Sequence, residues 1–171
     1  MSAKKTATIP ARLAWEDRWN EPTLKQLLEP QKDQQKKVLP ELIEKVTDFE
    51  GVTYRMVWHG AAWKWTIQFD LADEKGKDLG ALAYLVPNPE RAVYCMPLRP
   101  ETVEQLPLKR LNKFIREGIR EAKCAVEIHW CIWTPSAQTE VEHLTDLVKR
   151  VHKIALGKVP GKSKKSKSAS K

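Results

Sequence analysis

The stretch "MVWHGAAWKWTIQF", residues 56–69, decides the fold that this sequence is expected to adopt. Its second half alternates between apolar and polar side chains. One parity holds Trp63, Trp65, Ile67 and Phe69, and the other holds Lys64, Thr66, Gln68 and Asp70. Strict alternation of this kind predicts a β-strand with one buried and one open face. We therefore expect the tryptophans of this stretch to lie in a hydrophobic core.

The residues around this strand extend the pattern. Residues 52–58 also alternate, "LGALAYLV" (79–86) is apolar on both parities, and "RAVYCM" (91–96) is a fourth candidate strand. Only short turns separate these segments. Successive strands joined by short turns predict an antiparallel meander of four strands.

Helical segments flank the meander. An amphipathic helix is expected at 32–49, with Pro40 beginning a fresh turn of it. Residues 99–123 and 139–157 are amphipathic as well, Pro107 is a point at which the first of these helices could divide into two, and "AVEIHWCIW" (125–133) between them is a fifth candidate strand. The predicted fold class is therefore α+β. It has an antiparallel sheet of about five strands (a four-strand meander, then helix, strand and helix) with helices packed mainly on one face.

The positive charge of the chain is concentrated at its two ends. The net charge is +8, from 30 basic and 22 acidic residues. Eight lysines lie in terminal segments without acidic residues: Lys4, Lys5, Lys158, Lys162, Lys164, Lys165, Lys167 and Lys171. Without them, residues 6–157 hold 22 basic and 22 acidic residues. We predict a flexible N-terminus (1–11), a single domain (12–157) and a disordered lysine-rich tail (158–171).

The cysteines and the hydropathy bear on the cellular setting. Cys95, Cys124 and Cys131 are odd in number and form no CxxC pair, which favours reduced thiols and a cytoplasmic location. Cys124 is expected to be buried where a helix meets a strand. No apolar run reaches the roughly 20 residues of a membrane span, so no membrane partner is predicted.

The polar face of the sheet is the candidate binding surface. If helices cover one side only, seven residues are expected to lie together on the other side: Arg55, His59, Lys64, Gln68, Glu127, His129 and Trp133. Cys131 would extend this surface, and Trp130 would point the other way, into the core. Histidine, carboxylate and cationic side chains in one place can recognise an anion or transfer a proton. The same residues would equally suit an ordinary solvated sheet face.

No signature of chemistry accompanies these residues. Glu127, His129 and Cys131 are potential metal ligands on one strand, but a metal site needs a further convergent ligand, so neither a metal nor a cofactor is predicted. The glycine-rich phosphate loops, HExxH and GxSxG are missing from the sequence. We therefore expect a non-catalytic binding or interaction module with a small ligand or a protein partner.

Two other function classes stay open. One is a small-molecule enzyme that uses His59, His129 and Glu127 on the open sheet face. The other is a nucleic-acid-associated protein whose tail lysines neutralise phosphates weakly and without sequence preference.

The stretch "YRMVWHGAAWKW" (54–65) resembles small bacterial proteins of the domain-of-unknown-function 3788 family. The likeness extends to an N-terminal tryptophan (Trp15 or Trp19), to "LAYLVPNP" (82–89) and to a helix–strand–helix ending at 101–155. It covers roughly residues 12–155. The resemblance implies one α+β domain and supplies no site residues.

Overall fold

An antiparallel sheet of six strands, in the order β1-β2-β3-β4-β6-β5, is the centre of residues 11–158, the part of the chain that this computed structural model describes. The strands are β1 (Val52–Trp58), β2 (Trp65–Ala72), β3 (Asp78–Val86), β4 (Val93–Leu98), β5 (Lys123–Ala125) and β6 (Ile128–Trp133). The helices are η1 (Ala14–Glu16), α1 (Leu24–Leu28), α2 (Asp33–Thr47), α3 (Gly60–Trp63), α4 (Pro100–Gln105), η2 (Leu108–Arg110), α5 (Lys113–Arg120) and α6 (Gln138–Ala155). The predicted α+β class and the meander β1–β4 are confirmed.

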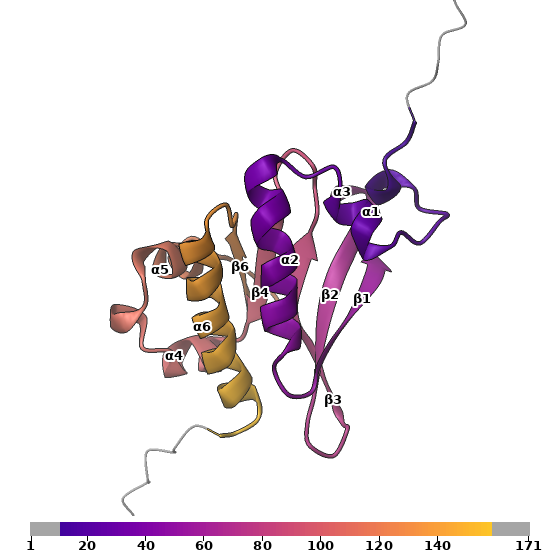
Figure 1. Cartoon of the computed structure of the whole chain (residues 1–171). Coiled ribbons are helices and arrows are strands. Elements are labelled where there is room, and N and C mark those ends of the chain that lie inside the picture. Colours follow the sequence, from indigo (N-terminus) through magenta and orange to yellow (C-terminus); the bar gives the residue numbers. More distant parts are fainter. Residues whose placement is uncertain (1–10, 159–171) are drawn as a thin grey trace, which may run out of the picture.

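The two faces of the sheet differ in what covers them. The long helices α2 and α6 lie side by side across one face (Figure 1). This covered face includes one row of partners across five strands: Met56, Ile67, Leu85, Tyr94 and Trp133. The row beside it belongs to the opposite, open face and consists of Arg55, Gln68, Tyr84, Cys95 and Ile132. The helices thus pack mainly on one face, as predicted.

Helix α2 shows why the covered face forms. Its buried residues Val38, Leu42 and Val46 recur every four residues, so they form one apolar stripe toward the sheet. The helix continues through Pro40, which is exposed. The expectation that Pro40 begins a new turn is therefore wrong, because burial of the apolar stripe outweighs the one backbone hydrogen bond that proline cannot donate.

Gln35 ties α2 to two loops of the sheet. Its side-chain amide accepts a hydrogen bond from the backbone N–H of Ala92 at 3.0 Å. It also donates to the carbonyl oxygens of Ala92 at 3.0 Å and of Pro135 at 3.3 Å. Gln35 is buried, and a buried amide without these partners would be costly. The amide therefore fixes how α2 sits on the sheet.

The second half of the chain forms two strands where the sequence predicts one. Residues 123–133 make a hairpin of β5 and β6, and its turn is formed by Val126 (φ 50°) and Glu127 (φ 58°). Positive φ at both turn residues is the geometry of the tightest two-residue hairpins. The apolar–polar alternation of 125–133 does not reveal this turn, because Val126 is a strand-forming residue that here is 93% exposed.

The alternation in β6 is opposite to the one expected. Cys131 and Trp133 are buried on the covered face, whereas Trp130 and Ile132 lie on the open face. Because β6 is apolar on both parities, its register with β4, not its sequence, decides which face each residue takes. Helix α5 then covers Trp133 closely: a Cβ atom on Gly118 would lie 2.1 Å from the indole Nε1.

Trp63 also departs from the predicted strand. Gly60 (φ 79°) and Lys64 (φ 55°) bend the chain between β1 and β2 into the single helical turn α3. Trp63 therefore does not share a face with Trp65, which is buried in the core as predicted. The bend carries Trp63 to the open face of the sheet, where it meets Tyr84 and Trp130.

Candidate functional site

Four rings gather on the open face and form an aromatic patch, defined as His59, Trp63, Tyr84 and Trp130. The ring centroids of His59 and Tyr84 lie 5.3 Å apart, and those of Trp63 and Tyr84 lie 5.5 Å apart. Trp130 closes the group at 6.2 Å from Trp63 and 6.1 Å from Tyr84. Most of these pairs are edge-to-face, which is a favourable arrangement for aromatic rings.

Three separate segments supply the patch. His59 follows the last residue of β1, and Trp63 ends α3, so the bend at Gly60 brings both toward the sheet. Tyr84 stands in the middle of the sheet, opposite Gln68 on one side and Cys95 on the other. Trp130 is contributed by β6, beyond β4. The patch therefore depends on the complete strand order and does not belong to one hairpin.

A chain of hydrogen bonds runs along the same face beside the rings. His59 Nε2 lies 3.1 Å from Gln68 Oε1. Gln68 Nε2 donates to Asp70 Oδ1 at 2.6 Å, and Arg55 Nε donates to Asp70 Oδ2 at 2.7 Å. The Asp70 carboxylate raises the pKa of the Arg55 guanidinium, so this end of the chain is an ion pair.

The hydrogen bonds made by Gln68 determine which ring nitrogen of His59 carries a proton. The ionised Asp70 can only accept, so the amide NH₂ of Gln68 must point toward it. The amide oxygen of Gln68 then faces His59, and Nε2 of the ring must donate to it. In a neutral imidazole with its proton on Nε2, Nδ1 is the acceptor. The hydrogen-bond chain thus holds His59 in one tautomer and in one orientation.

Each of the four rings has one polar atom that reaches solvent. Nδ1 of His59, Nε1 of Trp63, Oη of Tyr84 and Nε1 of Trp130 have no hydrogen-bond partner in residues 11–158. The two buried side-chain atoms without a partner there are Gln31 Oε1 and Tyr94 Oη. The four ring atoms are therefore reached by solvent, and together they offer one acceptor, two indole donors and a phenol.

Burial raises the pKa of Tyr84, a member of the patch, and of Cys95, its cross-strand partner. Burial, and then the charge of Asp70, raise the pKa of Tyr84, so its phenol stays protonated. Burial also raises the pKa of Cys95 to about 12, although Cys95 is a residue of the open face. Cys95, the cross-strand partner of Tyr84, is fully buried although it belongs to the open face.

Three of the seven predicted site residues come together here. Arg55, His59 and Gln68 all belong to the hydrogen-bond chain, in which Asp70 links Gln68 to Arg55. Four participants are missing from the predicted site: Trp63, Asp70, Tyr84 and Trp130. Asp70 and Tyr84 are on the same parity as Gln68 or directly opposite it, so strand pairing is the signal that would have found them.

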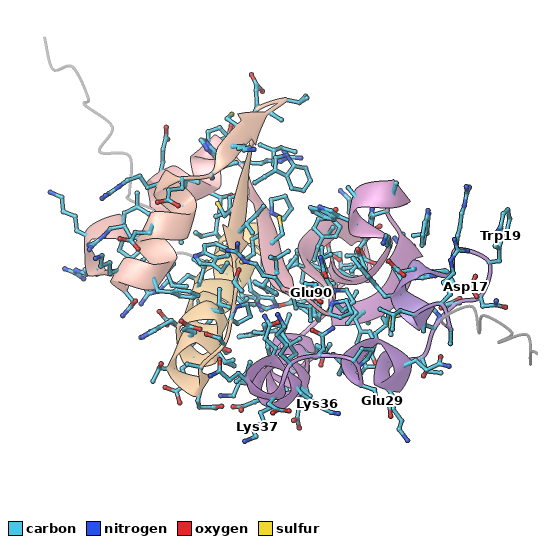
Figure 2. All side chains as sticks on the ribbon, turned by 90° about the horizontal axis from the view of Figure 1, so that it is seen from above. Asp17, Trp19, Glu29, Lys36, Lys37 and Glu90 are labelled. Carbon is cyan, nitrogen blue, oxygen red and sulfur yellow. The ribbon has the colours of Figure 1, made fainter. Side chains whose placement is uncertain are left out.

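Lys64 does not join this group. Its ammonium forms an ion pair with Glu16 Oε1 at 2.5 Å and lies 4.4 Å from the centre of the Trp15 ring. It lines a hollow of about 360 Å³ at the end of the hairpin, next to Trp58 and Trp19. Trp19 is 81% exposed and projects from the loop before α1 (Figure 2). Lys64 thus anchors the N-terminal segment to the hairpin.

The remaining predicted residues lie elsewhere. Glu127 is in the exposed β5–β6 turn, and Trp133 is buried under α5, where its Nε1 donates to the carbonyl of Phe114 at 3.2 Å. His129 faces α5 on the covered side of the sheet. His59, His129 and Glu127 are therefore not assembled into one cluster. Cys124, expected in the core, is exposed because it lies on the short edge strand β5.

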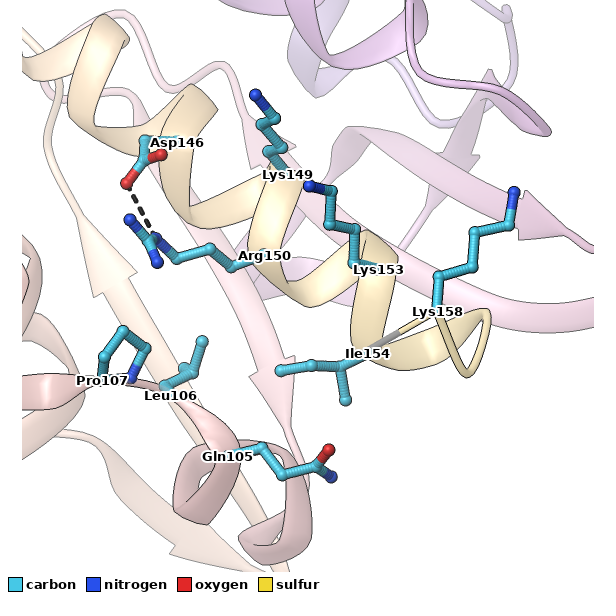
Figure 3. A pocket seen from close by; sticks show the side chains of 9 residues that line it. All are labelled: Gln105, Leu106, Pro107, Asp146, Lys149, Arg150, Lys153, Ile154 and Lys158. Atoms are coloured by element: carbon cyan, nitrogen blue, oxygen red, sulfur yellow. Dashed lines mark hydrogen bonds and ion pairs between the residues drawn. The ribbon is translucent and has the colours of Figure 1, made fainter. Parts of the chain in front are cut away.

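Basic side chains gather along α6. A pocket of about 390 Å³ between α6 and the end of α4 is lined by Lys149, Arg150, Lys153 and Lys158, among others (Figure 3). Arg150 is paired with Asp146 at 2.9 Å, and Lys158 with Glu74 at 2.8 Å. The predicted binding of nucleic acid by the rest of the tail concerns residues 159–171, which lie outside the described residues.

In residues 11–158, no three histidine, cysteine or acidic side chains are grouped closely enough to hold a metal ion. None of the helices in that range has the length and the apolar character that crossing a membrane would require. A scan against protein-family models and a search of the curated proteins found no match to this chain.

Proposed function

We propose that this chain is a non-catalytic binding module that holds a planar, aromatic group of its ligand against the aromatic patch. The proposal rests on one observation: four half-buried rings converge on the open face, and each has one polar atom without a hydrogen-bond partner in residues 11–158. Aromatic side chains with one apolar body and one free polar tip are enriched at binding surfaces. Binding without chemistry fits the separation of His59 from His129 and Glu127.

The hydrogen-bond chain indicates which chemical group of the ligand would face His59. Because His59 Nδ1 is held as an acceptor, the ligand group is expected to donate to it, as an exocyclic amine does. The absence of a pair among Cys95, Cys124 and Cys131 supports a reducing, cytoplasmic setting for this module. From the likeness of residues 54–65, we also propose that the protein is related to the domain-of-unknown-function 3788 family.

Adenosine is a suitable first probe, because it has a planar base with an amino donor. Purine riboside lacks the amino group, and ribose lacks the base. The indole N–H signals in NMR spectra report the position of binding. Those of Trp63 and Trp130 should shift with adenosine, whereas those of Trp15, Trp65 and Trp133 should not, because these three donate to backbone carbonyls inside the protein.

Binding strength separates the patch from other surfaces. Trp130→Ala should weaken adenosine binding at least about fivefold, the lower range for loss of one stacking partner. Trp19→Ala removes an exposed indole outside the patch and should change nothing. Adenosine should bind more tightly than purine riboside, and ribose should not bind. Shifts confined to Trp19 and Trp58, or no shift up to millimolar adenosine, would refute the proposal.

A further inference from the structure

A second cavity lies on the covered side of the sheet, away from the aromatic patch. Helices α4 and α5, the turn η2 and strand β6 line a half-open pocket of about 450 Å³, within the range of small-molecule sites. Its apolar lining comes from Val103, Leu108 and Ile119. Its polar lining comes from Lys109, Arg116, Arg120 and His129. The predicted site residue His129 thus has a place in a different site from His59.

The charge of this pocket is of one sign. None of its lining residues is acidic, and none of the ion pairs within residues 11–158 involves Lys109, Arg116 or Arg120. Arg116 and Arg120 are four residues apart on α5, so they project from the same side of the helix and repel each other. The pocket beside α6 differs, because its Arg150 and Lys158 are neutralised by acidic partners. An anion would relieve the repulsion in the pocket of α5.

Helix α5, the wall of the pocket that carries both arginines, is anchored to the rest of the fold. Asn112 caps α5 by accepting from the backbone N–H of Phe114 at 2.8 Å. Trp133 holds the middle of the helix, since its indole donates to the Phe114 carbonyl and packs against Gly118 without space for a Cβ atom. Ile119 is 7% exposed and faces the core. Arg116 and Arg120 are therefore presented from a helix that is anchored at its start and along its length.

We infer that this pocket, lined by Lys109, Arg116, Arg120 and His129 over an apolar floor, binds a small organic oxyanion with an apolar body. Guanidinium groups match the planar, two-oxygen geometry of carboxylates and phosphates. Val103, Leu108 and Ile119 would contact the apolar body. The site is separate from the aromatic patch, and the two ligands differ in charge.

Three probes test the two halves of the inference in the full chain. Phenyl phosphate has both the anion and the apolar body, inorganic phosphate has only the anion, and benzyl alcohol has only the body. Phenyl phosphate should shift the backbone amide signals of residues 103–120 and the ring signals of His129. It should bind at least about tenfold more tightly than either partial probe.

Matched charge removal tests the assignment to α5. Arg116→Gln with Arg120→Gln should weaken phenyl phosphate binding at least about tenfold. Lys36→Gln with Lys37→Gln removes the same charge from the exposed side of α2 and should have no effect (Figure 2). The single variant Arg120→Gln, at an exposed position, provides a milder test if the double variant unfolds.

Several results would overturn the inference. Equal binding of benzyl alcohol would show an apolar cavity without anion recognition, and equal binding of inorganic phosphate would show charge attraction alone. An equal loss in the Lys36 and Lys37 variant would show that only net charge matters. Shifts confined to α6 and the residues after it would place the anion on the lysines there.

Discussion

Trp65 and Trp130 lie on opposite faces of one sheet, and their indole groups are used differently. The Trp65 Nε1 donates to the carbonyl of Asp17 at 2.7 Å, and on the same covered face the Trp133 Nε1 donates to Phe114. The Trp130 Nε1 has no partner in the described part of the chain and is reached by solvent. On the covered face the indoles hold structure together, whereas on the open face they are available to a ligand.

The strongest test of this difference removes one indole from each face. Trp65→Ala should lower the free energy of unfolding by about 3–5 kcal/mol, the range for emptying a buried aromatic site. Trp130→Ala should cost less than half as much, because its ring is only half-buried. Urea unfolding of both variants measures the two values. Equal losses would mean that the two faces are equally structural.

Gly118 tests how closely the covered face is packed. Gly118→Ala would place a Cβ atom 2.1 Å from the Trp133 indole, so a loss of about 1–3 kcal/mol is expected, as in overpacked cores. Alanine is the better helix former, so helix propensity alone predicts the opposite sign. Thermal unfolding decides between them. Glu117→Ala, at an exposed position beside it, serves as the control and should stay within about 0.5 kcal/mol.

The reactivity of two buried cysteines, one on each face of the sheet, shows how well each face excludes solvent. Burial raises the pKa of Cys95, on the open face, and of Cys131, on the covered face, to about 12. Both should therefore react slowly with a thiol reagent at pH 8, while the exposed Cys124 reacts fast. Tyr84→Ala removes the cross-strand partner of Cys95 and should accelerate the reaction of Cys95 with the reagent, but not that of Cys131. Equal acceleration of Cys131 would indicate general loosening instead.

The same pKa values give a pH dependence with a defined sign. Both thiols are raised from an ordinary value near 9 to about 12 in the folded state. The unfolded chain therefore loses these protons first, and the stability that they contribute is present below pH 9 and lost between pH 9 and 12. Urea unfolding of the parent and of Cys95→Ala at pH 8 and pH 10 measures this loss. The decrease should be smaller in the variant.

The smallest expected effect concerns the hydrogen-bond chain of the open face. Asp70→Asn replaces an acceptor-only group by one that also donates, so Gln68 is free to turn its amide. The unfolding midpoint should hardly change, since Arg55 is exposed and surface ion pairs contribute little. The tautomer of His59, read from ¹⁵N NMR of its ring, should shift away from Nε2–H. An unchanged tautomer would show that His59 is oriented by the rings alone.

The sequence predicts the first four strands because each alternates or is bounded by a clear turn. It fails at Trp63, because the alternation of 63–69 continues through the bend that Lys64 makes at positive φ. It fails again at 125–133, where Val126 and Glu127 form a turn without glycine or asparagine. In both places a residue with strand-like or neutral propensity takes a turn conformation; Lys64 has contacts with Glu16 and Trp15 there, whereas Val126 is exposed.

The candidate site follows the same limits. Arg55, His59 and Gln68 come from the well-predicted hairpin, so their proximity is correctly predicted. Glu127 and His129 come from the segment whose register is set by β4, and one residue of shift moves a side chain to the other face. The sequence therefore predicts Trp130 in the core and Trp133 on the open face, the reverse of what the structure has.

The amide of Gln35 sets a constraint on the time course of folding. Its acceptors on Ala92 and Pro135 follow it by 57 and 100 residues. At roughly 5–20 residues per second, a ribosome needs about 5–20 s to synthesise the second interval. Until then the Gln35 amide lacks one of its acceptors, and α2 also lacks helix α6, which packs beside it in the complete fold. A nascent chain halted before Pro135 should therefore be a target for chaperones, because its apolar surfaces stay exposed to other chains.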